Sequence, residues 1–135
     1  MAAKVSEAAE GLRERLATIT GLRTFEYLSD TFQPPAAMVN IDNVDYHQAF
    51  AGGDPVYTFT VTLFVARAEE RTAQRKLDEY LSYGGDKSVR AAIENDTSLG
   101  GRVETCVVVS GGNIAAVQVN EATYLSIEFS VIVHP

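Results

Sequence analysis

The chain has few of the residues that build metal clusters, disulfide frameworks and nucleophilic active sites. Its 135 residues include one cysteine, two histidines and no tryptophan. A lone cysteine excludes an internal disulfide and any cysteine-rich metal site. Cys106 stands in the apolar run TCVVVS, which favours a buried free thiol over a nucleophile. Such sparse cysteine usage is typical of a reducing compartment such as the cytoplasm.

Long apolar runs are also absent. No stretch approaches the roughly 20 apolar residues that a helix needs to cross a bilayer. The N-terminal stretch MAAKVSEAAEGLRERL is amphipathic, and its charges interrupt it before an apolar core can form. We therefore expect no signal peptide and no membrane contact.

Positive charge is missing from two long segments. All eleven lysines and arginines lie within Lys4–Arg23 and Arg67–Arg102, and the net charge is −7. Residues 24–66 and 103–135 contain acidic residues but no lysine or arginine. Sequence-specific DNA binding needs basic clusters against the phosphates. The scattered cations are therefore expected to solvate helix faces.

Residues that carry chemistry are sparse. His47 and Asp45 could form a general-base pair on one strand face, but no nucleophile accompanies them, and an exposed strand histidine is the favoured interpretation. The segment Asp42–Asp45 and Asp54 lack the glycine and distal glutamate of a calcium loop, so turn formation explains them better. The Gly-Gly pairs match no phosphate-binding motif and are interpreted as turns. We expect no catalytic, cofactor-binding or metal-binding residue, and no enzyme.

Apolar periodicity predicts a helix, then strands, two helices and further strands. The first helix is expected over 4–19, with Ser6 as a candidate cap, and the second over 70–83. A short third helix is expected after Asp86 or Ser88. Strands are expected around 25–27 and at 36–41, 44–50, 56–66, 103–109, 114–119 and 123–133, with a tight turn at 111–113. This order predicts one α+β domain over residues 1–135, a largely antiparallel sheet with an N-terminal helix and a central helix pair on one face.

The stretch GDKSVRAAIENDTSLGG, residues 85–101, places a short helical pattern between two glycine pairs. Val89, Ala92 and Ile93 form its apolar face, and Leu99 follows a polar tail. Nothing in the stretch can hold a metal or attack a substrate. We expect it to dock on the sheet, with Leu99 filling the core beneath the glycines.

Four motifs occur in a recognisable order: LATITGLR at 16–23, PPAA at 34–37, RTAQRKLDEYL at 71–81 and SVRAAIENDTSLGG at 88–101. Over nearly its whole length the chain resembles the tail-terminator proteins of long-tailed, siphovirus-type bacteriophages, particularly those that infect actinobacteria. The resemblance implies an α+β subunit of a hexameric ring that caps the tail tube, stops its polymerisation and joins the tail to the head. The implied partners are the tail tube protein and the head-tail connector or stopper protein. The implied location is the head-tail junction of the virion, after assembly in the host cytoplasm. The family has no catalytic residues to transfer.

A closed ring needs two different surfaces that match. Opposite charges are expected at its subunit or partner interfaces, from Asp42, Asp45 and Asp54 and from Arg67, Arg71 and Arg75. Genomic DNA would pass without specific binding through a lumen formed by the segments that lack lysine and arginine, with Arg71, Arg75 and Lys76 turned away. Two alternatives stay open: another phage neck protein, such as a head-completion or stopper protein, and a small enzyme or ligand-binding domain.

Overall fold

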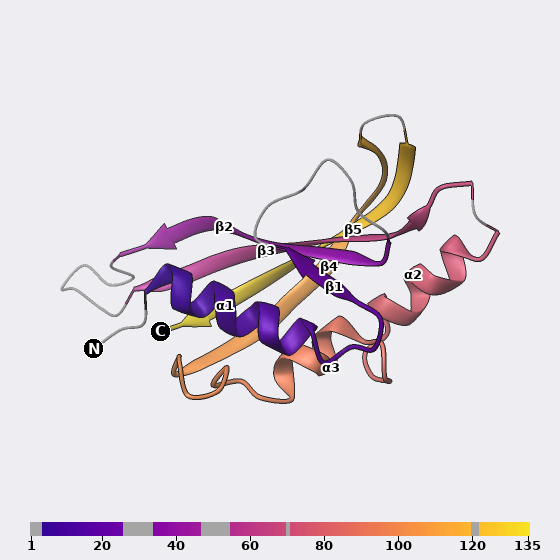
Figure 1. The fold of residues 1–135 in the computed structure, drawn as a ribbon. Helices are drawn as coiled ribbons and strands as arrows, with labels where there is room; N and C mark the ends of the chain where they lie inside the picture. Colours follow the sequence, from indigo (N-terminus) through magenta and orange to yellow (C-terminus); the bar gives the residue numbers. More distant parts are fainter. Residues whose placement is uncertain (1–3, 26–33, 47–54, 70, 120–121) are drawn as a thin grey trace.

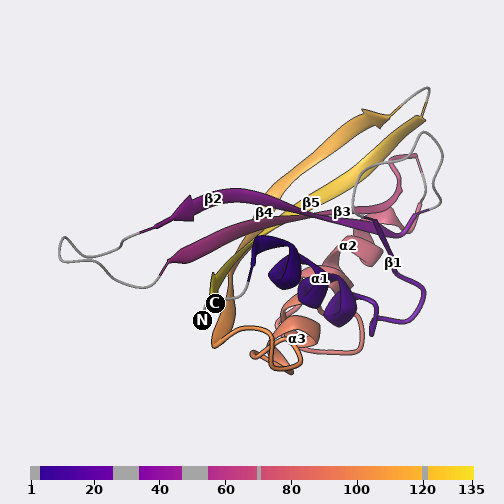
Figure 2. The same ribbon diagram turned by 60° about the vertical axis from the view of Figure 1, so that its left-hand side comes forward.

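The computed structural model describes residues 4–25, 34–46, 55–69, 71–119 and 122–135. Five strands form one sheet in the order β1-β2-β3-β5-β4, in which β1 and β2 are parallel and the other neighbours are antiparallel. All three helices lie on one side of this sheet (Figures 1 and 2). The predicted α+β class and its helix-covered sheet are confirmed. The elements are α1 (Val5–Leu16), β1 (Arg23–Phe25), β2 (Ala36–Asp45), β3 (Val56–Arg67), α2 (Ala73–Leu81), α3 (Val89–Glu94), β4 (Thr105–Val119) and β5 (Ala122–His134).

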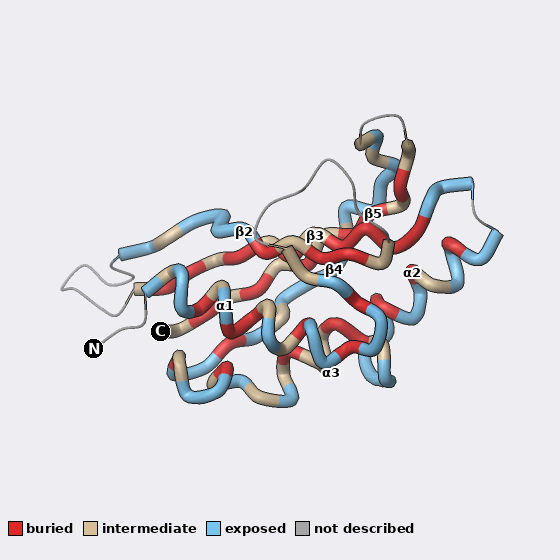
Figure 3. The backbone as a smooth tube through the Cα atoms, in the orientation of Figure 1, coloured by how far each residue is buried: buried red, intermediate tan, exposed pale blue. Residues whose placement is uncertain are grey.

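The core lies between the sheet and the helices, where Figure 3 shows the buried segments concentrated. The central strand β3 alternates through its middle: its odd-numbered apolar residues from Tyr57 to Leu63 are buried, whereas Thr58, Thr60 and Thr62 on the other face are half-buried. The alternation ends at Phe64, from which every residue to Ala66 is buried. Strand β5 continues the buried row with Ile127, Phe129, Val131 and Val133. Burial of these side chains provides the main driving force for folding. The predicted aromatic core residues Tyr57, Phe59 and Phe129 are confirmed as buried.

The first helix covers this core with Ala8, Leu12 and Leu16, all fully buried. It is shorter than predicted at its C-terminal end. The N–H groups of Thr18 and Ile19 bond to carbonyls three residues back, which tightens the chain into a turn after Leu16. Ser6, the candidate cap, is not used: Val5 is already helical, and Lys4 occupies the N-cap position without a side-chain hydrogen bond.

The second helix is also shorter than the predicted range of 70–83, and the third is the short helix that the sequence predicts. Helix α2 buries Ala73, Leu77 and Tyr80 and ends at Leu81, before the pair Gly84-Gly85. Ser88 caps α3, since its Oγ accepts a hydrogen bond from the backbone N–H of Ala91 at 3.1 Å. Of the two candidate caps, Ser88 rather than Asp86 is therefore the one used.

The expected turn at 111–113 is wrong. A single strand, β4, runs through it from Thr105 to Val119 and pairs with β5, with irregular register between Val108 and Ser110 and between Gly112 and Ala115. A bulge inserts an extra residue and shifts the alternation, so one long strand has the pattern of two short ones. Gly111 lets the sheet pack tightly here, because a Cβ atom on it would lie 2.8 Å from the Phe129 ring.

The acidic segment Asp42–Asp45 does not form the predicted turn either. It belongs to β2 and pairs with the start of β3, with a register shift between Ile41 and Asn43. The bulge lies at Asp42. Residues 47–50, the rest of the strand expected over 44–50, lie outside the described residues, as do Tyr27, the glycine pair at 52–53 and the histidine at position 47.

Candidate interaction surfaces

The acidic residues expected at an interface lie at one end of the sheet. Asp42 and Asp45 are exposed near the C-terminal end of β2, which extends beyond the helices (Figure 1). Asp54 lies outside the described residues. The end of β2 therefore presents two carboxylates to solvent on an extended strand.

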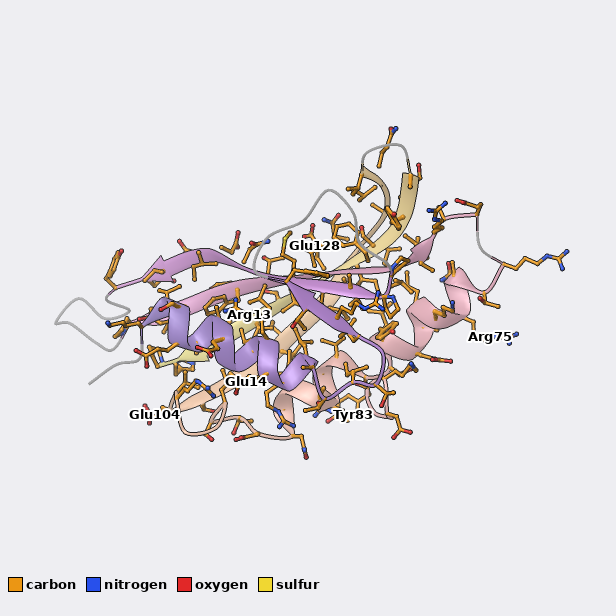
Figure 4. The ribbon with its side chains drawn as sticks, in the orientation of Figure 1. Arg13, Glu14, Arg75, Tyr83, Glu104 and Glu128 are labelled. Carbon is orange, nitrogen blue, oxygen red and sulfur yellow. The ribbon has the colours of Figure 1, made fainter. Side chains whose placement is uncertain are left out.

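The basic residues expected at an interface lie at the other end. Arg67 is the last residue of β3, Arg71 lies in the turn before α2, and Arg75 is on α2; all three are exposed. Figure 4 shows Arg75 projecting from the α2 end of the molecule. Strand β3 has 12 residues, and it separates the two ends by about 36 Å. The acidic and basic sets therefore cannot meet within one copy of the chain.

The two sides of the sheet differ in charge. Of the eleven lysines and arginines, only Arg23 and Arg67 belong to strands, and both stand at strand ends. The side of the sheet away from the helices, called here the open face, is built from rows such as Asn40, Thr60 and Ser130, which pair across β2, β3 and β5. Glu128 belongs to this face and lies opposite the helices in Figure 4. The other nine cations lie in the helices and in the chain segments around them.

The 85–101 stretch is anchored by a buried leucine and by hydrogen bonds to one carboxylate. Leu99 is buried and has a positive φ of 51°, followed by Gly100 and Gly101 with φ values of 72° and 86°. The Asp96 carboxylate holds this unusual backbone: it accepts hydrogen bonds from the Ser98 hydroxyl at 2.7 Å and from the Gly100 N–H at 2.9 Å. These bonds lower the pKa of Asp96, that from Ser98 most strongly. The expected core position of Leu99 is confirmed.

A groove that the sequence reasoning missed borders the outer edge of β4. Its volume is about 310 Å³, and its lining includes Tyr83, Arg90, Val109 and Phe129. The Arg90 guanidinium lies 3.6 Å from the centre of the Tyr83 ring and 3.1 Å from a Glu94 carboxylate oxygen. Glu94 in turn accepts the outward backbone N–H of Val108 at 3.0 Å. The feature of the sequence that could have indicated this exposed strand edge is the absence of any charged residue from 105 to 119.

A second groove lies beside α2, with a volume of about 420 Å³. Arg75, Lys76 and Lys87 line it together with Glu79 and Tyr80, and the Lys87 ammonium donates to the Thr20 carbonyl at 3.4 Å. Burial raises the pKa of Tyr80, and the nearby Glu79 carboxylate adds to this. Such a lining can attract anionic groups, but it contains no thiol, hydroxyl–histidine pair or metal-ligand set.

In the part of the chain that the structure describes, the residues with potential reactivity are not assembled into a site. Cys106 is buried, and burial above all raises the pKa of its thiol to about 11, so the reactive thiolate is scarce at neutral pH. His134 ends β5, where its carbonyl accepts the N–H of Glu104. Within the described ranges, no group of three histidine, cysteine, aspartate or glutamate side chains is placed to hold a metal.

No protein-family model matches the chain, and no curated protein matches it. Among the residues that the structure describes, no helix is both long and apolar enough to span a membrane. Function must therefore be argued from the surfaces described above.

Proposed function

We propose that this protein is the tail terminator of a long-tailed bacteriophage. Copies of the chain form a ring, hexameric by the family resemblance, that caps the tail tube, stops its polymerisation and joins the tail to the head connector. The ring acts at the head-tail junction of the virion and assembles in the host cytoplasm. The protein has no catalytic step in this role.

The observation that carries the proposal is the separation of charge between the two sides of the sheet. A tail ring must let the genome pass without holding it. Cations lining the lumen would bind phosphates, and the ring would multiply each of them by its copy number, so binding would be strong and steeply salt-dependent. The open face avoids this, because β2, β4 and β5 carry no lysine or arginine and Glu128 adds negative charge. We therefore assign the open face to the lumen and the helical layer to the outside.

The two ends of the sheet support the same role. With strands running along the ring axis, Asp42 and Asp45 lie near one rim, and Arg67, Arg71 and Arg75 near the other. One rim then meets the tail tube protein and the other meets the connector or stopper protein. Opposite charge on the two rims would favour one orientation and raise association rates more than affinity.

The decisive experiment is negative-stain imaging of phage that lack this protein. We expect tails of excess length, because nothing stops tube polymerisation. Tails of normal length beside filled heads that leak DNA would instead identify a head-completion or stopper protein. Complementation with the wild-type gene is the control, and intact, infectious particles without the protein would contradict both phage roles.

A further inference from the structure

We propose that subunits of the ring join edge to edge, through pairing of the outer edge of β4 with the outer edge of β2 from a second copy of this chain. The inference rests on the proposed ring, since it names the contact that builds it. Three features of the described residues support it: an unprotected β4 edge, a complementary β2 edge, and the alignment of the two edges across the sheet.

Strand β4 is an edge without the usual protection. Its 15 residues, from Thr105 to Val119, include no proline and no charged side chain. Val107, Val109 and Ile114 are 43 to 55% exposed. Proteins usually guard long edge strands with charges, prolines or a covering element, because the unpaired backbone groups are a template for another strand. The N–H of Val108 is covered by the Glu94 carboxylate. We infer that a partner strand covers this edge.

The groove beside β4 fits an acidic strand. Arg90 places its guanidinium next to the edge, held on the Tyr83 ring and against Glu94. Val109 and Phe129 give the same groove apolar surface. A strand entering here would gain backbone hydrogen bonds from β4, apart from the Val108 N–H that Glu94 already holds, together with apolar contact from Val109 and favourable charge from Arg90.

This chain itself carries such a strand. Strand β1 covers only Ala36, Ala37 and Met38 of β2, so the outer edge from Val39 to Asp45 has no strand beside it in the described part of the chain. Asp42 and Asp45 would repel each other if two β2 edges paired. Their charge is opposite to that of Arg90. Charge therefore disfavours pairing between two β2 edges and favours pairing of β2 with β4.

The alignment of the edges fixes the direction of the contact. Each step from β2 through β3 and β5 to β4 is antiparallel, so β2 and β4 run in opposite directions. Asn43, Thr58, Ile132 and Val107 form one continuous row across the sheet. A neighbour at the same height thus brings its Asn43 beside Val107 in an antiparallel pair. Because the two edges differ, the contact is head-to-tail and can repeat until a ring closes.

Disulfide trapping tests the contact. Asn43→Cys and Val107→Cys are made in separate chains, one of which carries a mass tag, and the mixture is oxidised mildly. We expect a cross-linked species that contains one chain of each kind, and a ladder of multimers when both cysteines are in one chain. Ala116→Cys, at the far end of β4, is the matched control and should cross-link with Asn43→Cys at least tenfold less. Wild type, whose Cys106 is buried, sets the background.

The trapping is carried out on purified protein and on phage particles assembled with the variants. Val107→Cys dimers alone would show that β4 pairs with itself and would overturn the proposal. If Val107→Cys does not cross-link with Asn43→Cys in either preparation, the proposal is also overturned. The imaging experiment distinguishes failure of the contact from failure of the proposed function. Overlong tails in phage that lack the protein, together with no cross-link, would contradict only the β4–β2 contact. Tails of normal length, together with the cross-link, would contradict only the terminator role.

Discussion

Leu99 fills the space that a side chain at Gly11 would need. A Cβ atom added to Gly11 would lie 2.8 Å from the Cβ of Leu99, closer than such atoms approach in proteins. Gly11 is a buried position of α1, and Leu99 is the buried tip of the 85–101 stretch. The N-terminal helix and the LGG motif are thus matched to each other across the core.

Gly11→Ala should destabilise the protein despite the better helix propensity of alanine. The gain in propensity is about 1 kcal/mol, whereas overpacking a core costs about 1 to 3 kcal/mol, and the Leu99 Cβ cannot rotate away. We expect a net loss of about 1 kcal/mol in the free energy of unfolding, measured with urea. Gly84→Ala is the control, because no atom lies within 4 Å of its added Cβ. Equal stability of the two variants would refute the match between Gly11 and Leu99.

Asp96→Asn should weaken the turn that holds Leu99 and reduce the pH dependence of stability. The Ser98 and Gly100 hydrogen bonds lower the pKa of the Asp96 carboxyl in the folded protein below its ordinary value of 3.8. A lowered pKa contributes stability that is present above pH 3.8 and is lost as the pH falls through the folded value. Thermal unfolding at pH 7 and pH 3 checks this. A variant as stable and as acid-sensitive as wild type would contradict it.

Cys106 should be inert while the protein is folded. Its pKa is raised from 9.0 to about 11 by burial and, less strongly, by Glu94 and Asp96, and the thiolate is the form that alkylates. Iodoacetamide at pH 8 should leave native protein unmodified and label it fully in urea, as measured by mass spectrometry. A raised thiol pKa also predicts that stability falls as the pH rises from 9 to 11, because the unfolded chain loses the proton first. Rapid labelling of the native protein would show that the thiol is accessible.

Charge reversal at the acidic end of β2 should weaken ring formation. In Asp42→Lys/Asp45→Lys, two exposed carboxylates become cations that Arg90 of a neighbour would repel. We expect slower assembly and at least a tenfold weaker association in analytical ultracentrifugation or in capping of tail tubes. Glu7→Lys/Glu10→Lys on the exposed face of α1 makes the same charge change and should leave assembly unaffected. If both double variants assemble like wild type, these acids are not at an interface.

The wild-type protein should not bind duplex DNA in a gel shift at physiological salt. Thr60→Lys/Ser130→Lys adds two cations to a cross-strand pair on the open face, so assembled rings should retain DNA in a salt-sensitive way and infectivity should fall. Glu10→Lys/Glu79→Lys adds cations to the exposed helical layer and should leave infectivity intact. Tight DNA binding by the wild-type protein would contradict the assignment of the open face to the lumen.

Local pattern predicted much of the fold. The alternation from Tyr57 to Leu63, the helical spacing of Leu12 and Leu16, and the apolar face of α3 each follow from a residue's immediate neighbours in sequence. The burial of Cys106 also followed from its apolar context. These predictions hold because amphipathic periodicity determines which side of an element faces the core.

Tertiary structure alone decided the remaining features. The bulges that make 105–119 one strand depend on pairing with β5, and the strand character of Asp42–Asp45 depends on β3. The groove at Arg90, the row that joins Asn43 to Val107 and the Gly11–Leu99 contact all bring together residues far apart in sequence. The local sequence pattern was enough for the three helices, the central strand, much of the core and the segments without positive charge. Which edges stay open and which face lacks cations were decided by the order of strands in the sheet, because that order is set by long-range pairing and not by local periodicity.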